Sequence, residues 1–174
     1  MQQRKPKLVC FYGPESTGKS TMAKKMAEIF QTEFVPEVAR EMISSNDFTI
    51  DDIIKIGKTQ TTRVEERLKT ANKILFCDTD LITTQIYSKK YLGVVPEILY
   101  ELENKIHYDH YFLFDTDVPW VADELRDLGG QRKEMMEIFE RELSKRNIKP
   151  TLVQGNWNER EEIIKQKIKS LIES

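Results

Sequence analysis

Short apolar runs and longer stretches of helical periodicity alternate along this chain. The apolar runs occur at residues 7–12, 33–36, 73–78, 111–115 and 151–155. Runs this short and continuous are typical of strands that are buried on both faces of a parallel sheet. Between them, apolar residues recur at helical spacing, which predicts helices at about 22–30, 49–72, 81–91, 96–107, 131–146 and from 159 onward.

This alternation determines the expected architecture. Consecutive strand–helix–strand units form parallel sheets with helices on both faces. The length of 174 residues suits one domain. We therefore expect a single α/β domain over residues 1–174, with a five-stranded parallel sheet in three α/β/α layers. The long helix at 49–72, capped by Thr49, is expected to bend near Gly57. Ligands bind such sheets at the carboxyl ends of the strands.

Charge and cysteine content argue against several classes of protein. The chain has 27 Lys and Arg against 29 Asp and Glu, so it lacks the excess of positive charge that binds nucleic acid. No apolar segment approaches membrane-spanning length or resembles a signal peptide. Cys10 and Cys77 both fall in predicted buried strands, which favours a reducing, cytoplasmic location. The sequence does not indicate an oligomeric state.

Residues 13–20, GPESTGKS, fit the phosphate-loop pattern G-x-x-x-x-G-K-[ST] and stand between a predicted strand and a predicted helix. Glycines let the backbone N–H groups wrap around phosphates at a helix N-terminus. Lys19 is expected to reach the β- and γ-phosphates of ATP and Ser20 to hold Mg²⁺. The alternative is an ordinary turn. The expected nucleotide contacts are Gly13, Glu15, Ser16, Thr17, Gly18, Lys19, Ser20 and Thr21.

Acidic residues follow the predicted strands at the ligand edge. Asp78 closes the third strand, where P-loop enzymes place the acid that orients Mg²⁺. Asp80 follows two residues later, and either acid could instead shape a turn or cap the next helix. Asp115 and Asp117 repeat the arrangement after the fourth strand, but they could serve only to shape the turn before Pro119.

Glu37 follows the second strand, where a carboxylate could accept the proton of a hydroxyl that attacks the γ-phosphate. Arg40 would reach the same space if a helix begins there. The alternative is a surface ion pair worth less than about 1 kcal/mol.

A lid is predicted over about residues 121–135. It contains Arg126 and Arg132, which could close on the transferring phosphate, and a Gly-Gly pair that permits hinge motion. The alternative is a Gly-Gly pair that merely ends a helix. Residues 155–160 follow the fifth strand, where such folds place the loop beneath the nucleotide base, although Trp157 could equally pack on the core.

Four segments carry a family resemblance: 13–21 (GPESTGKST), 35–41 (VPEVARE), 76–85 (FCDTDLITTQ) and 118–129 (VPWVADELRDLG). In order, and over nearly the whole chain, they are similar to the ribosylnicotinamide kinase domain of the NadR family. The resemblance implies a fold like that of nucleoside and nucleotide kinases. It also implies phosphorylation of the 5'-hydroxyl of nicotinamide riboside by Mg-ATP, giving nicotinamide mononucleotide for NAD salvage.

The resemblance implies roles for individual residues: Lys19 and Ser20 on phosphate and metal, Asp78 near the metal, Glu37, Arg40 and Asp80 toward the nucleoside, and Arg126 and Arg132 in the lid. Glu37 is the preferred base and Asp80 the second choice. Because the nicotinamide ring of the riboside is cationic, an aromatic face is expected in the site. Candidates are Trp120, which we prefer, Tyr87 and Phe34, although each could be a core residue.

The chain departs from the full NadR architecture, which adds an adenylyltransferase and often a helix-turn-helix domain. Its two histidines, in HYDH at 107–110, do not form the H-x-G-H adenylyltransferase signature. A second step to NAD is therefore not expected. Two other functions suit the same motifs: a kinase for another nucleoside, nucleotide or metabolite, and a regulatory module that binds ATP. A purely structural domain with a degenerate loop is disfavoured by the presence of Lys19, Ser20 and Asp78.

Overall fold

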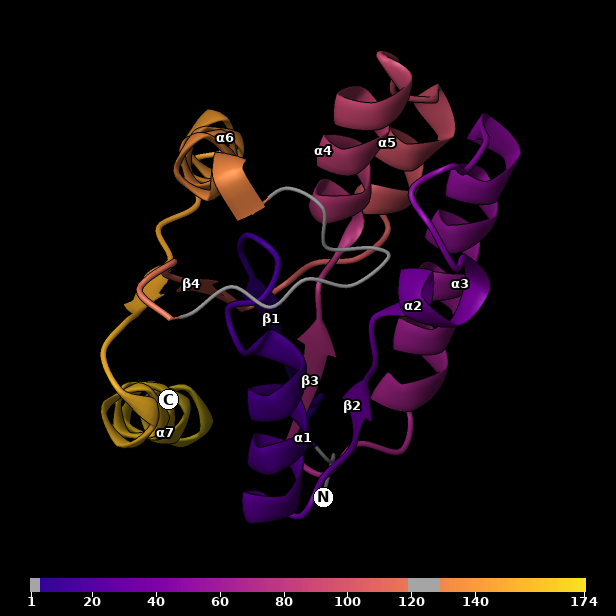
Figure 1. Ribbon diagram of the computed structural model, residues 1–174. Coiled ribbons are helices and arrows are strands. Elements are labelled where there is room, and N and C mark those ends of the chain that lie inside the picture. Colours follow the sequence, from indigo (N-terminus) through magenta and orange to yellow (C-terminus); the bar gives the residue numbers. More distant parts are fainter. Residues whose placement is uncertain (1–3, 119–128) are drawn as a thin grey trace.

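The computed structural model describes residues 4–118 and 129–174 (Figure 1). Five strands form one parallel sheet in the order β2-β3-β1-β4-β5. They are β1 (Lys7–Tyr12), β2 (Phe34–Val35), β3 (Ile74–Asp78), β4 (His110–Phe114) and β5 (Thr151–Val153).

Helices cover both faces of this sheet. They are α1 (Lys19–Ile29), α2 (Val38–Met42), α3 (Ile50–Leu68), α4 (Leu81–Leu92), α5 (Glu97–Glu103), α6 (Arg132–Lys145) and α7 (Trp157–Glu173), with a 3-10 turn at Gly129–Gln131. Figure 1 shows α1 and α7 on one side of the strands and α4 and α6 on the other. The predicted three-layer α/β fold is thereby confirmed, with strand and helix ends within a few residues of those expected.

The packing on the two faces of the central strand β1 explains why its sequence is almost entirely apolar. Val9 and Phe11 pack with residues of α1 and α7, whereas Cys10 and Tyr12 pack with residues of α4 and α6. Because alternate side chains enter two different cores, every position from Leu8 to Tyr12 is buried. Cys10 lies beside Cys77 of β3, and both thiols are free and buried, as expected for strand residues.

The structure gives Gly57 a packing role within the long helix α3. The helix α3 begins at a capping box between Thr49 and Asp52 and continues through Gly57 without interruption. A Cβ atom at Gly57 would lie 2.6 Å from Cδ2 of Leu99 in α5. Glycine therefore serves close packing between helices at this position.

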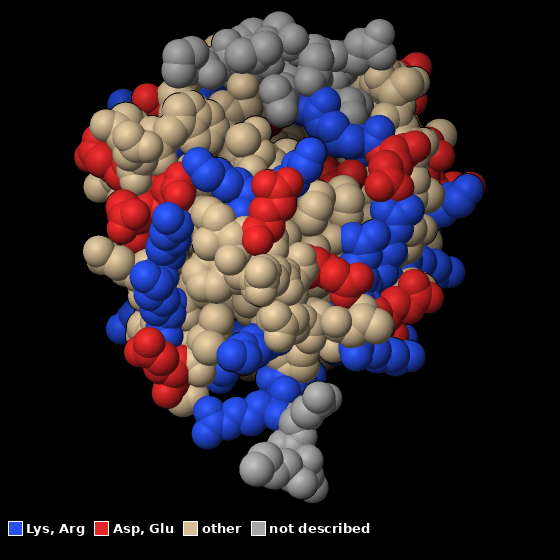
Figure 2. All heavy atoms as spheres, turned by 90° about the horizontal axis from the view of Figure 1, so that it is seen from below, with Lys and Arg blue, Asp and Glu red and all other residues tan. Residues whose placement is uncertain are grey.

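The surface agrees with the balanced composition. On the face drawn in Figure 2, basic and acidic side chains are interspersed. Within the described ranges, no helix has both the length and the apolar character needed to cross a bilayer.

Candidate active site

The phosphate loop, residues 13–20, leaves the carboxyl end of β1 and enters α1 in an unusual backbone conformation. Gly13, Ser16 and Gly18 have φ angles of 133°, 58° and 92°. A Cβ at Gly13 would lie 2.8 Å from the carbonyl oxygen of Phe114, so only glycine fits beside β4. The N-cap residue of α1 is Gly18, which has no side chain with which to cap the helix. The first N–H groups of α1 can therefore bind an anion.

Lys19, Ser20 and Asp78 meet at this loop. The Lys19 ammonium is buried and donates to the carbonyl oxygen of Pro14 at 2.6 Å. The Ser20 hydroxyl donates to Oδ2 of Asp78. The other oxygen, Oδ1, is buried and has no hydrogen-bond partner within residues 4–118 and 129–174. A hydroxyl oxygen next to a carboxylate oxygen that lacks a partner is a suitable pair of ligands for Mg²⁺. These residues therefore fit the metal that the sequence predicts.

The electrostatics of Asp78 agree with that fit. Burial, and next the nearby charge of Glu37, raise the pKa of the Asp78 carboxyl to about 7. Lys19 and the Ser20 hydroxyl act in the opposite direction. A cation at Oδ1 would compensate the burial and favour the ionised carboxylate.

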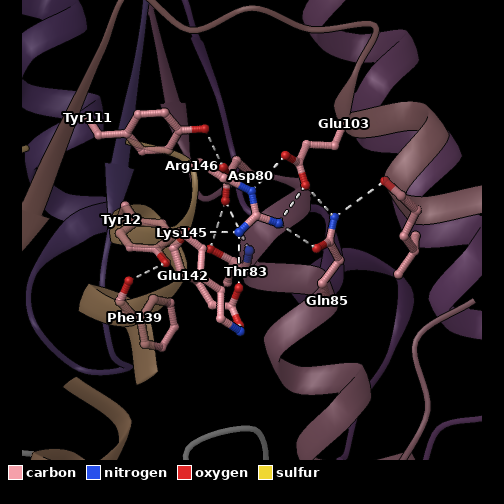
Figure 3. Close-up of polar contacts among 11 residues, drawn as sticks. Tyr12, Asp80, Thr83, Gln85, Glu103, Tyr111, Phe139, Glu142, Lys145 and Arg146 are labelled. Carbon is pink, nitrogen blue, oxygen red and sulfur yellow. Dashed lines mark hydrogen bonds and ion pairs between the residues drawn. The ribbon is translucent and has the colours of Figure 1, made fainter. Parts of the chain in front are cut away.

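Asp80 makes the helix-capping contact that the sequence left open as an alternative to a role at the substrate. Its Oδ1 accepts from the backbone N–H of Thr83 at 3.0 Å, so it caps α4, and its Oδ2 accepts from the Tyr111 hydroxyl at 2.7 Å (Figure 3). The side chain is 2% exposed and does not line the pocket described below. Thr79, between the two acids, has a φ of 73°, which is rare for a β-branched residue. We therefore assign Asp80 to the orientation of α4 and do not propose it as a base.

Glu37 and Arg40 lie on the acceptor side of the phosphate loop. Glu37 is the N-cap residue of α2 but makes no capping hydrogen bond with its side chain. The Arg40 Nε lies 3.6 Å from Oε2 of Glu37, and the two side chains are 32% and 26% exposed. Both line the same pocket as the phosphate loop. The structure thus brings together the carboxylate and the phosphate loop that were predicted separately.

That pocket extends from the phosphate loop into a space between α2, α3 and α4. Its far wall mixes apolar side chains with a few polar ones, as is usual for small-molecule sites: Ile43, Asn46, Phe48, Ile53, Ile56, Gln60, Thr79, Thr83, Thr84 and Tyr87. Sequence periodicity predicted helices here but did not indicate which faces would line a cavity. Tyr87 is a wall residue, as proposed, whereas Phe34 packs against the core beside α1.

Arg132 reaches the phosphate loop from the first turn of α6. Its Nη1 donates to the carbonyl oxygen of Val118 at 2.7 Å, and its Nη2 contacts that of Ser16 at 3.5 Å. Its Nε is buried and has no hydrogen-bond partner among the described residues, and burial lowers the pKa of the guanidinium. Arg132 therefore lies beside the phosphate loop, and its role in a lid stays a prediction. Trp120, Arg126 and the first part of the predicted lid lie outside the described residues.

Two residues after β5 lie against the phosphate loop and were not in the predicted site. The Trp157 ring lies against Gly18: its Cη2 atom would be 2.6 Å from a Cβ there, and the side chain is 48% exposed. Arg160 is fully buried, and its Nη1 donates to the carbonyl oxygen of Thr17 at 3.1 Å. Both contacts join positions about 140 residues apart in sequence, so no local pattern signals them.

Comparison with known proteins assigns the chain that carries this site to a family. The family described as an AAA domain, AAA_28, matches residues 8–160. The chain belongs to the AAA_28 family. This AAA_28 chain is 35% identical over 148 residues to the "Trifunctional NAD biosynthesis/regulator protein NadR" of Escherichia coli (strain K12). The match covers 80% of this chain but 36% of the relative.

Solved structures share the fold of the AAA_28 chain. A NadR protein in complex with NAD and AMP-PNP superposes with a TM-score of 0.81 at 21% identity, over 98% of this chain and 50% of that one. A NadR protein in complex with NR gives 0.72 at 23% identity, over 88% and 45%. Deoxyadenosine kinase from M. mycoides gives 0.68 at 13% identity, over 94% and 99%. The NadR resemblance and the kinase-like P-loop fold are thereby confirmed.

A substitution at Gly18 of the AAA_28 chain tests the packing around the phosphate loop. We expect Gly18→Ala to lower the free energy of unfolding by about 1–3 kcal/mol, because alanine is strained at a φ of 92° and its Cβ would overlap Trp157. Gly130→Ala is the matched control, since no atom lies within 4 Å of a Cβ there. Equal stability of the two variants in denaturant titrations would show that the Trp157 contact is wrong.

Proposed function

We propose that this chain is an ATP-dependent kinase that phosphorylates the 5'-hydroxyl of nicotinamide riboside and yields nicotinamide mononucleotide. One observation carries the proposal: the phosphate loop and the Glu37 carboxylate line one pocket, whose other half is suited to a nucleoside. A donor and an acceptor can therefore meet in that pocket without a large rearrangement, as group transfer requires.

ATP would bind with its phosphates along the loop. The N–H groups at the start of α1 and the Lys19 ammonium would hold the β- and γ-phosphates. Lys19 now donates to Pro14 and would exchange that carbonyl for phosphate oxygens. Ser20 and Asp78 would hold Mg²⁺, which supplies positive charge to the phosphates during transfer. Arg132, already at the Ser16 carbonyl, would add positive charge at the γ-phosphate.

Glu37 would act on the acceptor. Its carboxylate makes no capping bond, Glu37 lines the pocket, and its charge is near enough to Asp78 to raise the pKa of that carboxyl. A carboxylate in this place can accept the proton of the 5'-hydroxyl as the oxygen bonds to phosphorus. Arg40, whose Nε lies 3.6 Å from that carboxylate, could bond to ribose hydroxyls. No step in this scheme requires Asp80.

The pocket favours a nucleoside over a nucleotide as acceptor. Apart from Lys19 at the phosphate loop, Arg40 is the one cationic side chain among the described residues that line it. A nucleoside monophosphate would bring a dianion, which proteins usually hold with several arginines or lysines. A cationic nicotinamide ring would instead be favoured by the Tyr87 ring and by Glu37.

The relatives support the finer assignment. The curated relative is named for NAD biosynthesis, and one of the similar structures is a NadR protein in complex with NR. The chain spans 36% of that curated relative. We therefore propose the kinase step alone and leave the relative's other activities aside.

An acceptor panel tests the substrate. Purified protein would receive Mg-ATP with nicotinamide riboside, uridine, deoxyadenosine or thymidine monophosphate, and the products would be identified by mass. We expect the riboside to give the highest kcat/KM and a product heavier by one phosphoryl group. A higher kcat/KM for another nucleoside would replace the proposed substrate, and preference for the monophosphate would overturn the charge argument.

Asp78→Asn tests the metal ligands. An amide oxygen lacks the charge that binds Mg²⁺, so we expect the Mg²⁺ concentration for half-maximal activity to rise at least about tenfold. Asp115→Asn is the control, because the Asp115 side chain bonds to the backbone N–H of Thr116 and Asp115 does not line the pocket. An unchanged Mg²⁺ requirement in Asp78→Asn would remove this residue from the metal site.

A further inference from the structure

Arg160 is a buried cation with hydrogen-bond partners at all three of its guanidinium nitrogens. It lies in the first turn of α7, has no exposed surface, and donates from all three guanidinium nitrogens. Nε donates to the carbonyl oxygen of Gly155 at 2.8 Å, and Nη1 to that of Thr17 at 3.1 Å. Nη2 donates to the carbonyl oxygen of Asp115 at 3.2 Å and also pairs with the Asp117 carboxylate. A charge buried this deeply is retained only when it is fully paired.

These partners come from three separate loops at one edge of the sheet. Thr17 belongs to the phosphate loop after β1, Asp115 and Asp117 follow β4, and Gly155 follows β5. The second carboxylate oxygen of Asp117 accepts from the backbone N–H of Gly155 at 2.6 Å, which closes the connection between two of the loops. Arg160 is not among the residues that line the pocket, so it contacts the phosphate loop from behind.

The contact with Thr17 has a direct consequence for phosphate binding. In a planar trans peptide, the carbonyl oxygen of one residue and the N–H of the next point in opposite directions. Arg160 binds the Thr17 carbonyl oxygen and is not among the residues that line the pocket. The N–H of Gly18 must then point to the opposite side, where the phosphates of ATP would lie. A guanidinium behind the loop thus fixes the direction of a donor in front of it.

We propose that Arg160 is a positioning residue for ATP, which orients the peptide between Thr17 and Gly18 and ties the phosphate loop to the loops after β4 and β5. The proposal rests on ATP being the ligand of the phosphate loop, as proposed above. It concerns ATP alone and predicts no change in recognition of the acceptor. Loss of Arg160 should therefore raise the KM for ATP and leave the KM for the acceptor unchanged. A general loss of folded protein would not produce this difference between the two substrates.

Arg146 offers a matched control. It is also a partly buried arginine with several acceptors: it pairs with both carboxylate oxygens of Glu103 at 2.8 Å and bonds to Gln85 at 3.0 Å (Figure 3). It also pairs with Glu142 at 3.0 Å. These partners lie in α4, α5 and α6, away from the phosphate loop. Removing Arg146 should cost stability without changing the orientation of the Thr17 carbonyl.

The test compares Arg160→Met, Arg160→Lys and Arg146→Met. For each, one would measure the Kd of Mg-ATP by calorimetry without acceptor, the KM of each substrate, and thermal unfolding. We expect Arg160→Met to raise the Kd and KM for ATP at least about tenfold, as for the loss of a charged hydrogen bond in a binding site. The acceptor KM should stay within about twofold, which is below the effect of one lost hydrogen bond. Arg160→Lys should rescue only partly, because an ammonium cannot span the same acceptors.

Two results would overturn the proposal: unchanged ATP affinity in folded Arg160→Met, or an equal loss of ATP affinity in Arg146→Met. If Arg160→Met does not fold, Asp117→Asn gives the same decision, because it keeps an oxygen acceptor but removes the charge that pairs with Arg160. An ATP affinity in Asp117→Asn equal to that of the wild type would then refute the proposal. Calorimetry without acceptor keeps this outcome independent of whether nicotinamide riboside is the substrate.

Discussion

Replacing Lys19 by methionine is expected to lower kcat by about 10²–10³-fold, the loss typical of one charged donor to a transition state. Methionine keeps most of the buried aliphatic length of Lys19, so the fold should persist. In the wild type, the Lys19 ammonium would stabilise the negative charge that develops on the transferring phosphoryl group. Initial-rate assays with Mg-ATP and the riboside, together with thermal unfolding, measure both quantities.

Lys24 provides the control for Lys19. It lies on the same helix, α1, but it is exposed and does not line the pocket. Lys24→Met should retain kcat within about twofold, as is usual for surface substitutions. If Lys19→Met kept a comparable rate, the loop at 13–20 would not be the site of phosphoryl transfer, whatever its backbone conformation.

Replacing Glu37 by glutamine is expected to lower kcat by about 10²–10⁴-fold, the usual contribution of a general base. The amide is nearly the same size and can still accept a hydrogen bond, but it cannot take the proton of the hydroxyl. The dissociation constant of Mg-ATP should change little, because Glu37 lies on the acceptor side of the phosphate loop. Single-turnover rates and calorimetry separate the two effects.

Glu41 is the matched control for Glu37. It lies one turn later on α2, pairs with Arg63 at 2.6 Å, and does not line the pocket. Glu41→Gln should therefore leave kcat near that of the wild type. A Glu37→Gln variant with a similar rate would mean that the proton leaves the hydroxyl by another route, since phosphoryl transfer does not always need a strong base.

The parts of the molecule that the sequence predicted well depend on local chemistry. The buried strands are predictable because both of their faces are apolar, as Phe11 and Tyr12 illustrate. The phosphate loop is predictable because its glycines, Lys19 and Ser20 are contiguous. Asp78 and Glu37 follow from topology, since the carboxyl ends of parallel strands meet at one edge.

The parts that the sequence did not predict depend on contacts between distant segments. Asp78 and Asp80 are two residues apart, yet one bonds to the Ser20 hydroxyl and the other is enclosed by Thr83 and Tyr111. No local pattern distinguishes them, because the turn at Thr79 decides which way each carboxylate points. The contact of Arg160 with the phosphate loop was not predicted for the same reason, because its partner Thr17 is 143 residues away in the sequence.

The central claim is that phosphoryl transfer from ATP to nicotinamide riboside takes place in this pocket. It is tested most directly by measuring ADP and phosphorylated nucleoside in the same sample, with and without the riboside. The account predicts one 5'-phosphorylated nicotinamide nucleotide for each ADP and little ADP when the riboside is absent. ADP release that does not depend on the riboside, without any phosphorylated product, would contradict it and favour an ATP-binding regulatory module.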